Sequence, residues 1–493
     1  MDLELPDQFL YARKGPWPQP SPSHPTQCAD EVLNIPPMEA LLFNGTIGAR
    51  YIQGRIGYPP IAGQYAAAHR DWTGPTRERF EEILFSTLYT RFLLPLTEAD
   101  RARCTAGLDF GQDRWWKYDF SAMDLVKPIP GTYCAPTKLF IRERPDGQRN
   151  CLCIQIHRDE PLYVEPGDAS WGLAMLYALQ GAAYHVLFVV HPALHFPMDS
   201  VNAITKTSVP MAHPLFQLLT PHASYSLSLD NAVLESAESV VNNNAQGTRF
   251  DPLTANAYNL KLLFGAGYRG LPEADYGNAY PPFSYRRPAM GFESDYGRWL
   301  AAYYERAFLP FCRTVASHIL QAGLTEYVRR WARYNHTHVL GFPEEREILD
   351  ADVLAETMAI YIWNASVAHG GDHASFSNQI EPIEKCLRIR RPPPRSKDEA
   401  PVRSGEIFNG DDVARAALCQ HLFFQTWAIP PNLDETYYAF TEPDLQAAVT
   451  DFHARLLEVS RDPALRHFMP LRADPAADPP VPYDRTIPQS IQY

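Results

Sequence analysis

Four histidines form two pairs with the same spacing. His191 and His195 are four residues apart, and so are His369 and His373. Residues i and i+4 share one face of an α-helix, so each pair can direct two imidazoles toward one point. A single buried histidine is more often a hydrogen-bonded core residue, but four buried imidazoles without partners would be costly. A metal ion shared by both pairs satisfies all four, and we therefore predict a metal site.

The ligand types narrow the choice of metal only in part. Imidazole suits Zn, Cu, Fe and Ni, and the chain has no H-E-x-x-H pattern that would indicate a zinc hydrolase. A cation also requires an anionic ligand. Asp372 is adjacent to His373, but successive helical residues point about 100° apart, so another carboxylate is needed. The chain end is one candidate, because "RTIPQSIQY" carries apolar residues up to Tyr493, where chain ends are usually frayed.

Long helices must carry the histidine pairs. Residues 171–195 and 349–376 are apolar nearly all round, as is typical of helices at the centre of a large domain. Further helices are predicted over residues 77–96, 295–324 and 442–465. The dominant periodicity is helical, so the pattern predicts a mainly α fold.

The clearest strand signal lies ahead of the first histidine pair. Residues 137–157 contain two β-type runs around "RPDG", which predicts a hairpin with its turn at residues 145–147. Residues 387–405 are charged and proline-rich and predict a loop. Residues 1–35 are rich in Pro, Ser and Gln, and we expect an arm that is wrapped over the surface or partly disordered. A small antiparallel hairpin or sheet should therefore accompany the helices.

The other histidines in these segments have simpler interpretations. His213 and His222 in "HPLFQLLTPH" are expected to be helix caps or hydrogen-bonded core groups. His185 is expected to be structural or a neighbour of the ligands. His336 and His338 in "YNHTHVL" alternate as residues do in a strand or loop.

Composition limits the classes of function. The 493 residues carry a formal charge of -13, with 45% hydrophobic and 20% charged residues, which is typical of a globular protein. The negative charge argues against a nucleic-acid partner, and small-molecule substrates fit better. No run of about 18 apolar residues predicts a membrane span, and the first residues lack the pattern of a secretory signal. We therefore expect a cytoplasmic location.

Several stretches resemble, in the same order, the lipoxygenase family. "HPLFQLLTPH" is similar to the segment after the first histidine helix of that family, and "WNASVAHGGDHASF" is similar to its second metal helix. "RRPPPRSK" resembles the proline-rich loop of animal members, and "IPQSIQY" resembles their terminal Ile-Pro-x-Ser-Ile-x-Ile, the most specific signal. The resemblance covers roughly residues 130–493. It implies a single, mostly helical catalytic domain over residues 36–493, without the amino-terminal β-sandwich lipid-binding domain of plant and animal members.

The resemblance also implies a site and an activity. The metal would be a non-haem iron, with manganese as the alternative. By position its ligands would be His191, His195, His369, His373 and the α-carboxylate of Tyr493. The implied activity is removal of a hydrogen from an activated, bis-allylic C–H of a polyunsaturated fatty acyl substrate, followed by addition of O2 to give a hydroperoxide. A lipid substrate and O2 would be the partners, and peripheral contact with a membrane fits such a substrate.

The spacing of the first pair departs from the family. Its members place the first two histidines five apart, which requires a π-bulge, whereas His191 and His195 are four apart. An ordinary helical turn can therefore join them. Assigning the first ligand to His191 assumes a shift of one residue, because the position matched to the family's first ligand is Val190.

Further departures concern the substrate pocket. Val186 and Phe376 stand where the family has glutamines, and Val233 stands where it has Ala or Gly. We predict that Val233, Val367 and Phe376 line the pocket. These exchanges leave open an iron oxygenase or oxidase with the same fold that acts on a non-fatty-acid specialised metabolite. A catalytically silent lipid-binding homologue is a weaker alternative, because it would have no need for four histidines.

Deletion of Tyr493 is predicted to abolish metal binding. The new terminal carboxylate would stop one residue short, a displacement of about 3.5 Å along an extended chain. Tyr493→Ile keeps the carboxylate in place and should bind metal as the wild type does. Metal analysis of the purified proteins checks both statements, and full occupancy in the deletion variant would contradict the prediction.

Overall fold

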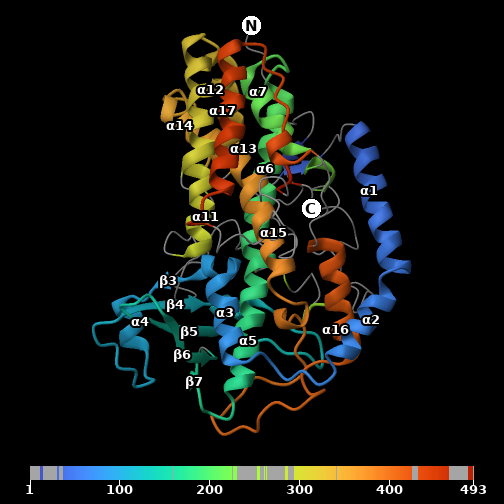
Figure 1. Ribbon diagram of the computed structural model, residues 1–493, viewed down its shortest axis with the longest axis vertical. Coiled ribbons are helices and arrows are strands. Elements are labelled where there is room, and N and C mark those ends of the chain that lie inside the picture. Colours follow the sequence, from blue (N-terminus) through green and yellow to red (C-terminus); the bar gives the residue numbers. More distant parts are fainter. Residues whose placement is uncertain are drawn as a thin grey trace.

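Helices dominate the structure. The computed structural model describes residues 12–14, 30–32, 37–157, 159–224, 226–229, 252–255, 260, 263, 284–286, 294–339, 341–424, 431–465 and 487–491. Figure 1 shows a long body of helices with a small sheet at its lower end, and α1 (Pro37–Ile56) and α2 (Pro59–Ala68) along one side. The predicted fold class, mainly α with a small antiparallel sheet, is confirmed.

Two interrupted helices run through the centre of the body, and we call them the first rod and the second rod. The segments of the first rod are α5 (Trp171–His185), the π-helical η3 (Val186–Val190) and α6 (His191–Ser208). The segments of the second rod are α14 (Ala351–Trp363), the π-helical η6 (Asn364–Ala368) and α15 (His369–Asn378). Nearly all their described side chains are buried, which confirms the two predicted central helices.

Shorter helices surround the two rods. They are α3 (Arg77–Ser86), α4 (Glu98–Arg103), α7 (Pro214–Leu219), α11 (Asp295–Tyr303), α12 (Leu309–Gln321), α13 (Thr325–His338), α16 (Gly410–Cys419) and α17 (Pro443–Ser460). α11 continues into α12 through the π-helical η5 (Tyr304–Phe308). The helices predicted over residues 295–324 and 442–465 are therefore present.

The helix predicted over residues 77–96 is wrong in its second half. α3 ends at Ser86, and the 3₁₀ helix η1 (Leu88–Phe92) follows. Thr87 separates them because its backbone is extended and its hydroxyl group accepts a hydrogen bond from the Tyr89 amide. The break frees the Leu88 amide, which donates to the Ser375 hydroxyl of the second rod at 2.9 Å. η1 is thereby attached to α15.

The sheet extends the predicted hairpin on both sides. Its five antiparallel strands lie in the order β3 (Leu94–Pro95), β4 (Arg114–Asp119), β5 (Thr137–Glu143), β6 (Arg149–Ile156) and β7 (Leu162–Val164). β5 and β6 form the hairpin, as predicted. Leu139 and Ile141 face the helical core, whereas Phe140 packs with Trp115 on the other face, because side chains alternate along a strand.

The predicted amino-terminal arm is described only at two places. β1 (Ala12–Lys14) and β2 (Asp30–Val32) pair in antiparallel register, with Ala12 opposite Val32. The rest of residues 1–35 lies outside the described part of the chain.

The first rod is long and apolar enough to cross a membrane. Residues 171–208 have the length and composition of a membrane span, although no span was predicted from the sequence. Of the most apolar 18-residue stretch in this segment, 94% is buried inside the structure. Core helices of large domains have the same properties.

Gly181 allows the first rod to approach the residues that follow β4. A Cβ atom at this position would lie 2.8 Å from the Phe120 side chain, closer than real Cβ contacts come. Phe120 and the neighbouring His185 are both buried, and their ring centroids are 4.9 Å apart. A side chain at position 181 would therefore displace an aromatic cluster next to the histidine helix.

Gly181→Ala is expected to lower the free energy of unfolding by about 1–3 kcal/mol, because the added methyl group overpacks this contact. Gly172→Ala in the same helix is the matched control, since no atom lies within 4 Å of its Cβ position. The control should be neutral or stabilising by up to about 1 kcal/mol. Urea unfolding of both variants measures the difference, and equal stabilities would contradict the prediction.

Candidate metal centre

A π-helical turn precedes each histidine pair. The His191 amide donates to the Val186 carbonyl oxygen, and the His369 amide donates to the Asn364 carbonyl oxygen. Each pair then lies within the first turns of an ordinary α-helix, α6 or α15. The structure therefore has an α-helical turn between His191 and His195, with the π turn directly before it and not within the pair.

The four imidazoles converge on one point. The Nε2 atom of His195 lies 2.9 Å from that of His191 and 2.9 Å from that of His369. The Nε2 atoms of His373 and His191 are 3.3 Å apart. All four ligand atoms lie within 4.8 Å of one another. The structure brings the two predicted pairs together, and their assignment as metal ligands, including that of His191, stays a prediction.

The cluster lies mostly in the interior, where burial disfavours protonation of His191 and His195. His195, His369 and His373 are buried, and His191 is half-buried. Burial lowers the pKa of His191 to about 4. The pKa of His195 is lowered further, by burial first and then by the charges of His191 and His373. Neutral imidazoles keep a lone pair on one nitrogen, so this donor set fits a first-row transition metal.

Asp372 does not join the cluster. Its carboxylate accepts a hydrogen bond from the Arg91 guanidinium of η1 and another, at 2.8 Å, from the Tyr296 hydroxyl of α11. The side chains of Arg91 and Asp372 are each only 2% exposed. A buried ion pair thus lies to one side of the histidine cluster, because Asp372 points about 100° away from the adjacent His373. Arg91 and Tyr296 were not anticipated, because no local pattern marks them.

Two glycines let other segments approach the same helical turn. A Cβ at Gly371 would lie 2.8 Å from atoms of Trp299 and Tyr296, and a Cβ at Gly370 would lie 3.2 Å from Pro488. α15 is therefore in contact with α11 on one side and with the carboxyl-terminal segment, residues 487–491, on the other. These contacts fix the rotation of the helix about its axis.

The carboxyl-terminal segment is held next to α15. The Ile487 carbonyl oxygen accepts from the Leu433 amide at 2.9 Å, and Ile487 and Ile491 are both buried. His222 donates from Nδ1 to the Gln489 carbonyl oxygen at 2.6 Å, so its neutral Nε2 accepts from the Tyr438 hydroxyl at 2.7 Å. Tyr493 lies outside the described residues, and its role as a ligand stays a prediction.

The other histidines considered in the sequence make contacts away from the four-histidine cluster. The prediction for His336 was wrong. His213 caps α7, and its Nδ1 accepts from the Leu215 amide. His185 contacts the Gly181 carbonyl oxygen at 2.7 Å, and burial lowers its pKa to about 4. His336 lies in the helix α13, not in a strand or loop. The preceding residues "YVRRWARY" have helical periodicity, and the helix they form continues through both histidines.

The predicted pocket residues are partly described. Val367 in η6 and Phe376 in α15 are buried, whereas Val233 lies outside the described residues. The Lys385 ammonium group lies 4.6 Å from the centre of the Phe376 ring, and burial lowers the pKa of this lysine to about 7. Phe376 therefore has a buried amine close to its ring.

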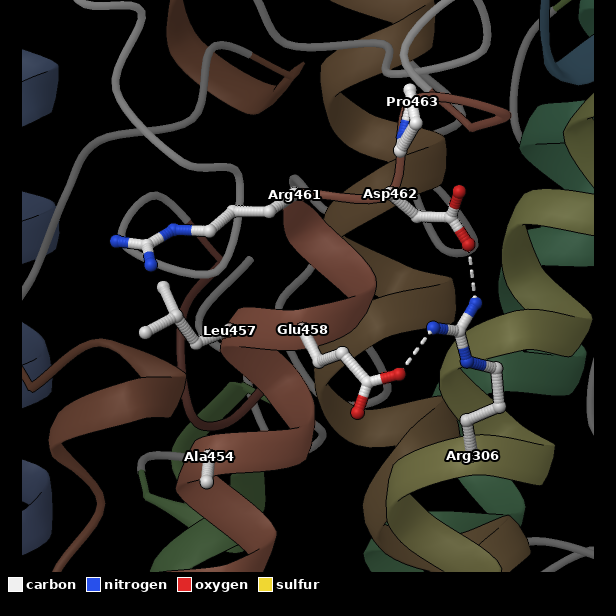
Figure 2. A pocket seen from close by; sticks show the side chains of 7 residues that line it. All are labelled: Arg306, Ala454, Leu457, Glu458, Arg461, Asp462 and Pro463. Carbon is white, nitrogen blue, oxygen red and sulfur yellow. Dashed lines mark hydrogen bonds and ion pairs between the residues drawn. The ribbon is translucent and has the colours of Figure 1, made fainter.

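Two surface hollows lie away from the histidines. Figure 2 shows a hollow of about 540 Å³ between η5 and α17, where Arg306 pairs with Glu458 at 2.8 Å and with Asp462 at 2.5 Å. The other hollow, of about 580 Å³, lies between α2 and α16. Neither is lined by any of the four histidines or by Val367 or Phe376.

Comparison with solved structures identifies the fold. No protein-family model and no curated protein matches the chain. The manganese lipoxygenase of Gaeumannomyces graminis matches with a TM-score of 0.67 and 16% identity, over 99% of this chain and 96% of that one. Coral 8R-lipoxygenase matches with a TM-score of 0.69 and 15% identity, over 95% and 78% of the two chains. A lipoxygenase from Fusarium graminearum matches with a TM-score of 0.62 and 14% identity, over 85% and 80%. The chain has the lipoxygenase fold.

Asp372→Ala is expected to lower the free energy of unfolding by about 3–5 kcal/mol, because it leaves the Arg91 charge buried and uncompensated. Asp451→Ala is the control, since it breaks the Asp451–Arg455 pair of α17, in which the Asp451 side chain is 61% exposed. That change should cost less than about 1 kcal/mol. Urea unfolding compares the two variants. A loss for Asp372→Ala no larger than that for the control would contradict the prediction.

Proposed function

We propose that this protein is a lipoxygenase-type dioxygenase of polyunsaturated fatty acyl chains. The observation that carries the proposal is the cluster of four convergent and mostly buried imidazoles, contributed in pairs by α6 and α15. The lipoxygenase fold supports it, because lipoxygenases of both a coral and two fungi match the chain along most of its length. Fold alone does not define an activity, so the proposal depends on the site.

The cluster suits iron or manganese. His191, His195, His369 and His373 would hold the ion, together with the α-carboxylate of Tyr493 if the terminal prediction holds. When bound, such an ion supplies the one-electron chemistry that removes a hydrogen atom from an activated C–H bond.

The chain's own residues prepare this site. Burial lowers the pKa of His191 and His195 and so keeps these two imidazoles unprotonated at neutral pH. The Arg91–Asp372 pair, Gly370 and Gly371 hold α15 so that His369 and His373 face α6. Val367 and Phe376 extend the apolar surroundings along the second rod, where an acyl chain would be bound without competition from water.

A second candidate is an oxygenase or oxidase that acts on a non-fatty-acid metabolite. Phe376 and Val186, both buried, favour it, because these positions correspond to glutamines of the lipoxygenase family. An amide next to a metal ligand tunes the metal through hydrogen bonds, whereas phenyl and isopropyl groups cannot. The two candidates share the metal site and differ in substrate.

Metal analysis and diene absorbance test the proposal. The purified chain should hold about one iron or manganese ion, and His369→Ala and His373→Ala should each lower occupancy at least about tenfold. His318→Ala is the control. His318 lies in α12, away from the cluster, and its Nδ1 atom pairs with the Asp444 carboxylate of α17. With linoleate or arachidonate and O2, the metal-loaded protein should form a conjugated diene.

Each outcome separates the candidates. A metal-free wild type would overturn both enzyme hypotheses and favour a silent lipid-binding protein. A metal-loaded wild type that forms no diene with any polyunsaturated acid would overturn the fatty-acid hypothesis and favour the second candidate. Loss of metal in His318→Ala as well would show that the histidine variants act through general unfolding.

A further inference from the structure

The outward side of α1 and α2 is apolar. Six large hydrophobic side chains there are between 48% and 75% exposed, and we call them the α1 face: Met38, Leu41, Leu42, Ile52, Ile56 and Ile61. Only two other large hydrophobic side chains in the described chain are comparably exposed, Met211 and Tyr437. Exposed apolar residues are therefore concentrated on one surface element, which lies along one side of the body (Figure 1).

Helical spacing aligns these residues. At about 100° per residue, Met38, Leu41, Leu42, Ile52 and Ile56 fall within an arc of about 100° on α1. Gly45 and Ala49, which are exposed as well, fill the gap between the two groups. The resulting stripe is about 27 Å long. It is a convex ridge along a helix and not a groove.

No described side chain around the stripe is both exposed and charged. Among the described side chains of residues 37–68, every exposed one is uncharged, although 20% of the whole chain is charged. Glu39 is half-buried and pairs with Lys206 at 3.2 Å, and Arg50 is buried. Charged side chains ordinarily keep a helix face in water, and here they are directed inward.

The opposite side of the two helices is anchored. Ala62 of α2 packs with Leu418 of α16 and with Leu422 of the π-helical η8 (Gln420–Phe424) that follows it. A Cβ at Gly54 would lie 2.5 Å from Leu422, which shows how closely α1 approaches that segment. The α1 face is thus presented outward by a helix pair that is packed against the body.

We propose that the α1 face docks on a lipid surface, with α1 lying in the plane of the interface. Apolar side chains along one side are what such a helix buries among acyl chains. A convex, uncharged ridge offers no charge pattern by which a protein partner would be recognised. The net charge of -13 disfavours anionic lipids, so the occupant is a neutral, zwitterionic bilayer. The choice of a bilayer over a second copy of the chain also draws on the proposed lipid substrate.

Sedimentation with phosphatidylcholine vesicles tests the proposal. The full-length wild type should co-sediment, and added salt should not release it, because neutral contacts are not screened. Leu41→Glu with Ile52→Glu should lower vesicle partitioning at least about tenfold. Met211→Glu with Tyr437→Glu is the matched control, since it adds the same charge at two apolar positions elsewhere that are at least as exposed as Leu41 and Ile52. The control should bind within about twofold of the wild type.

A second variant guards against misfolding. Leu41→Ser with Ile52→Ser removes apolar area without adding charge and should also weaken binding. A wild type that stays in the supernatant would overturn the proposal, as would equal binding by the α1-face and control variants. A wild-type dimer that the α1-face variants convert to monomers in the absence of vesicles would overturn it in favour of self-association. Sedimentation requires no turnover, so failure here leaves the diene assay with free fatty acid unaffected.

Discussion

The centre of this protein depends on four imidazole groups whose Nε2 atoms lie too close together for neighbouring rings to be protonated at the same time. Two unit charges at 2.9 Å, the distance between the Nε2 atoms of His195 and His369, repel by about 5–6 kcal/mol even at an effective dielectric constant of about 20. Separate protons cannot therefore occupy neighbouring rings, and burial lowers the pKa of His191 and His195. A single cation at the centre would interact with the lone pairs of all four nitrogens without that repulsion. The four-histidine cluster therefore fits a metal ion better than several protons, for an electrostatic reason.

Much of the surrounding structure serves this arrangement. Two long helices must be buried together, and both are apolar nearly all round. α15 is contacted closely at Gly370 and Gly371, where any side chain would push its neighbours away. The one charged residue in that turn, Asp372, is neutralised by Arg91, so it adds no field that would draw protons to the histidines. Packing and charge together keep the cluster in one geometry.

The histidine site and its two rods were predictable because the information is local. Spacing of four residues and continuous apolar character are properties of short segments, and they agreed with each other. Arg91 and Tyr296 were not predictable, since they lie 281 and 76 residues from Asp372 in the chain. The break of the predicted helix at Thr87 depends on a side-chain cap and on a contact with Ser375. Such tertiary contacts outweigh periodicity, and no pattern within residues 77–96 indicates them.

The distance along the chain between the two histidine pairs has a consequence for assembly. His195 and His369 are separated by 174 residues, and His191 and His373 by 182. Contacts of such long range form late in folding, because a large loop must close first. Each pair alone is a local feature that one helix can present early. A metal ion held by both pairs would bind the folded state and not the unfolded chain, so it would stabilise the finished protein by mass action. Metal occupancy would in this sense report that folding is complete.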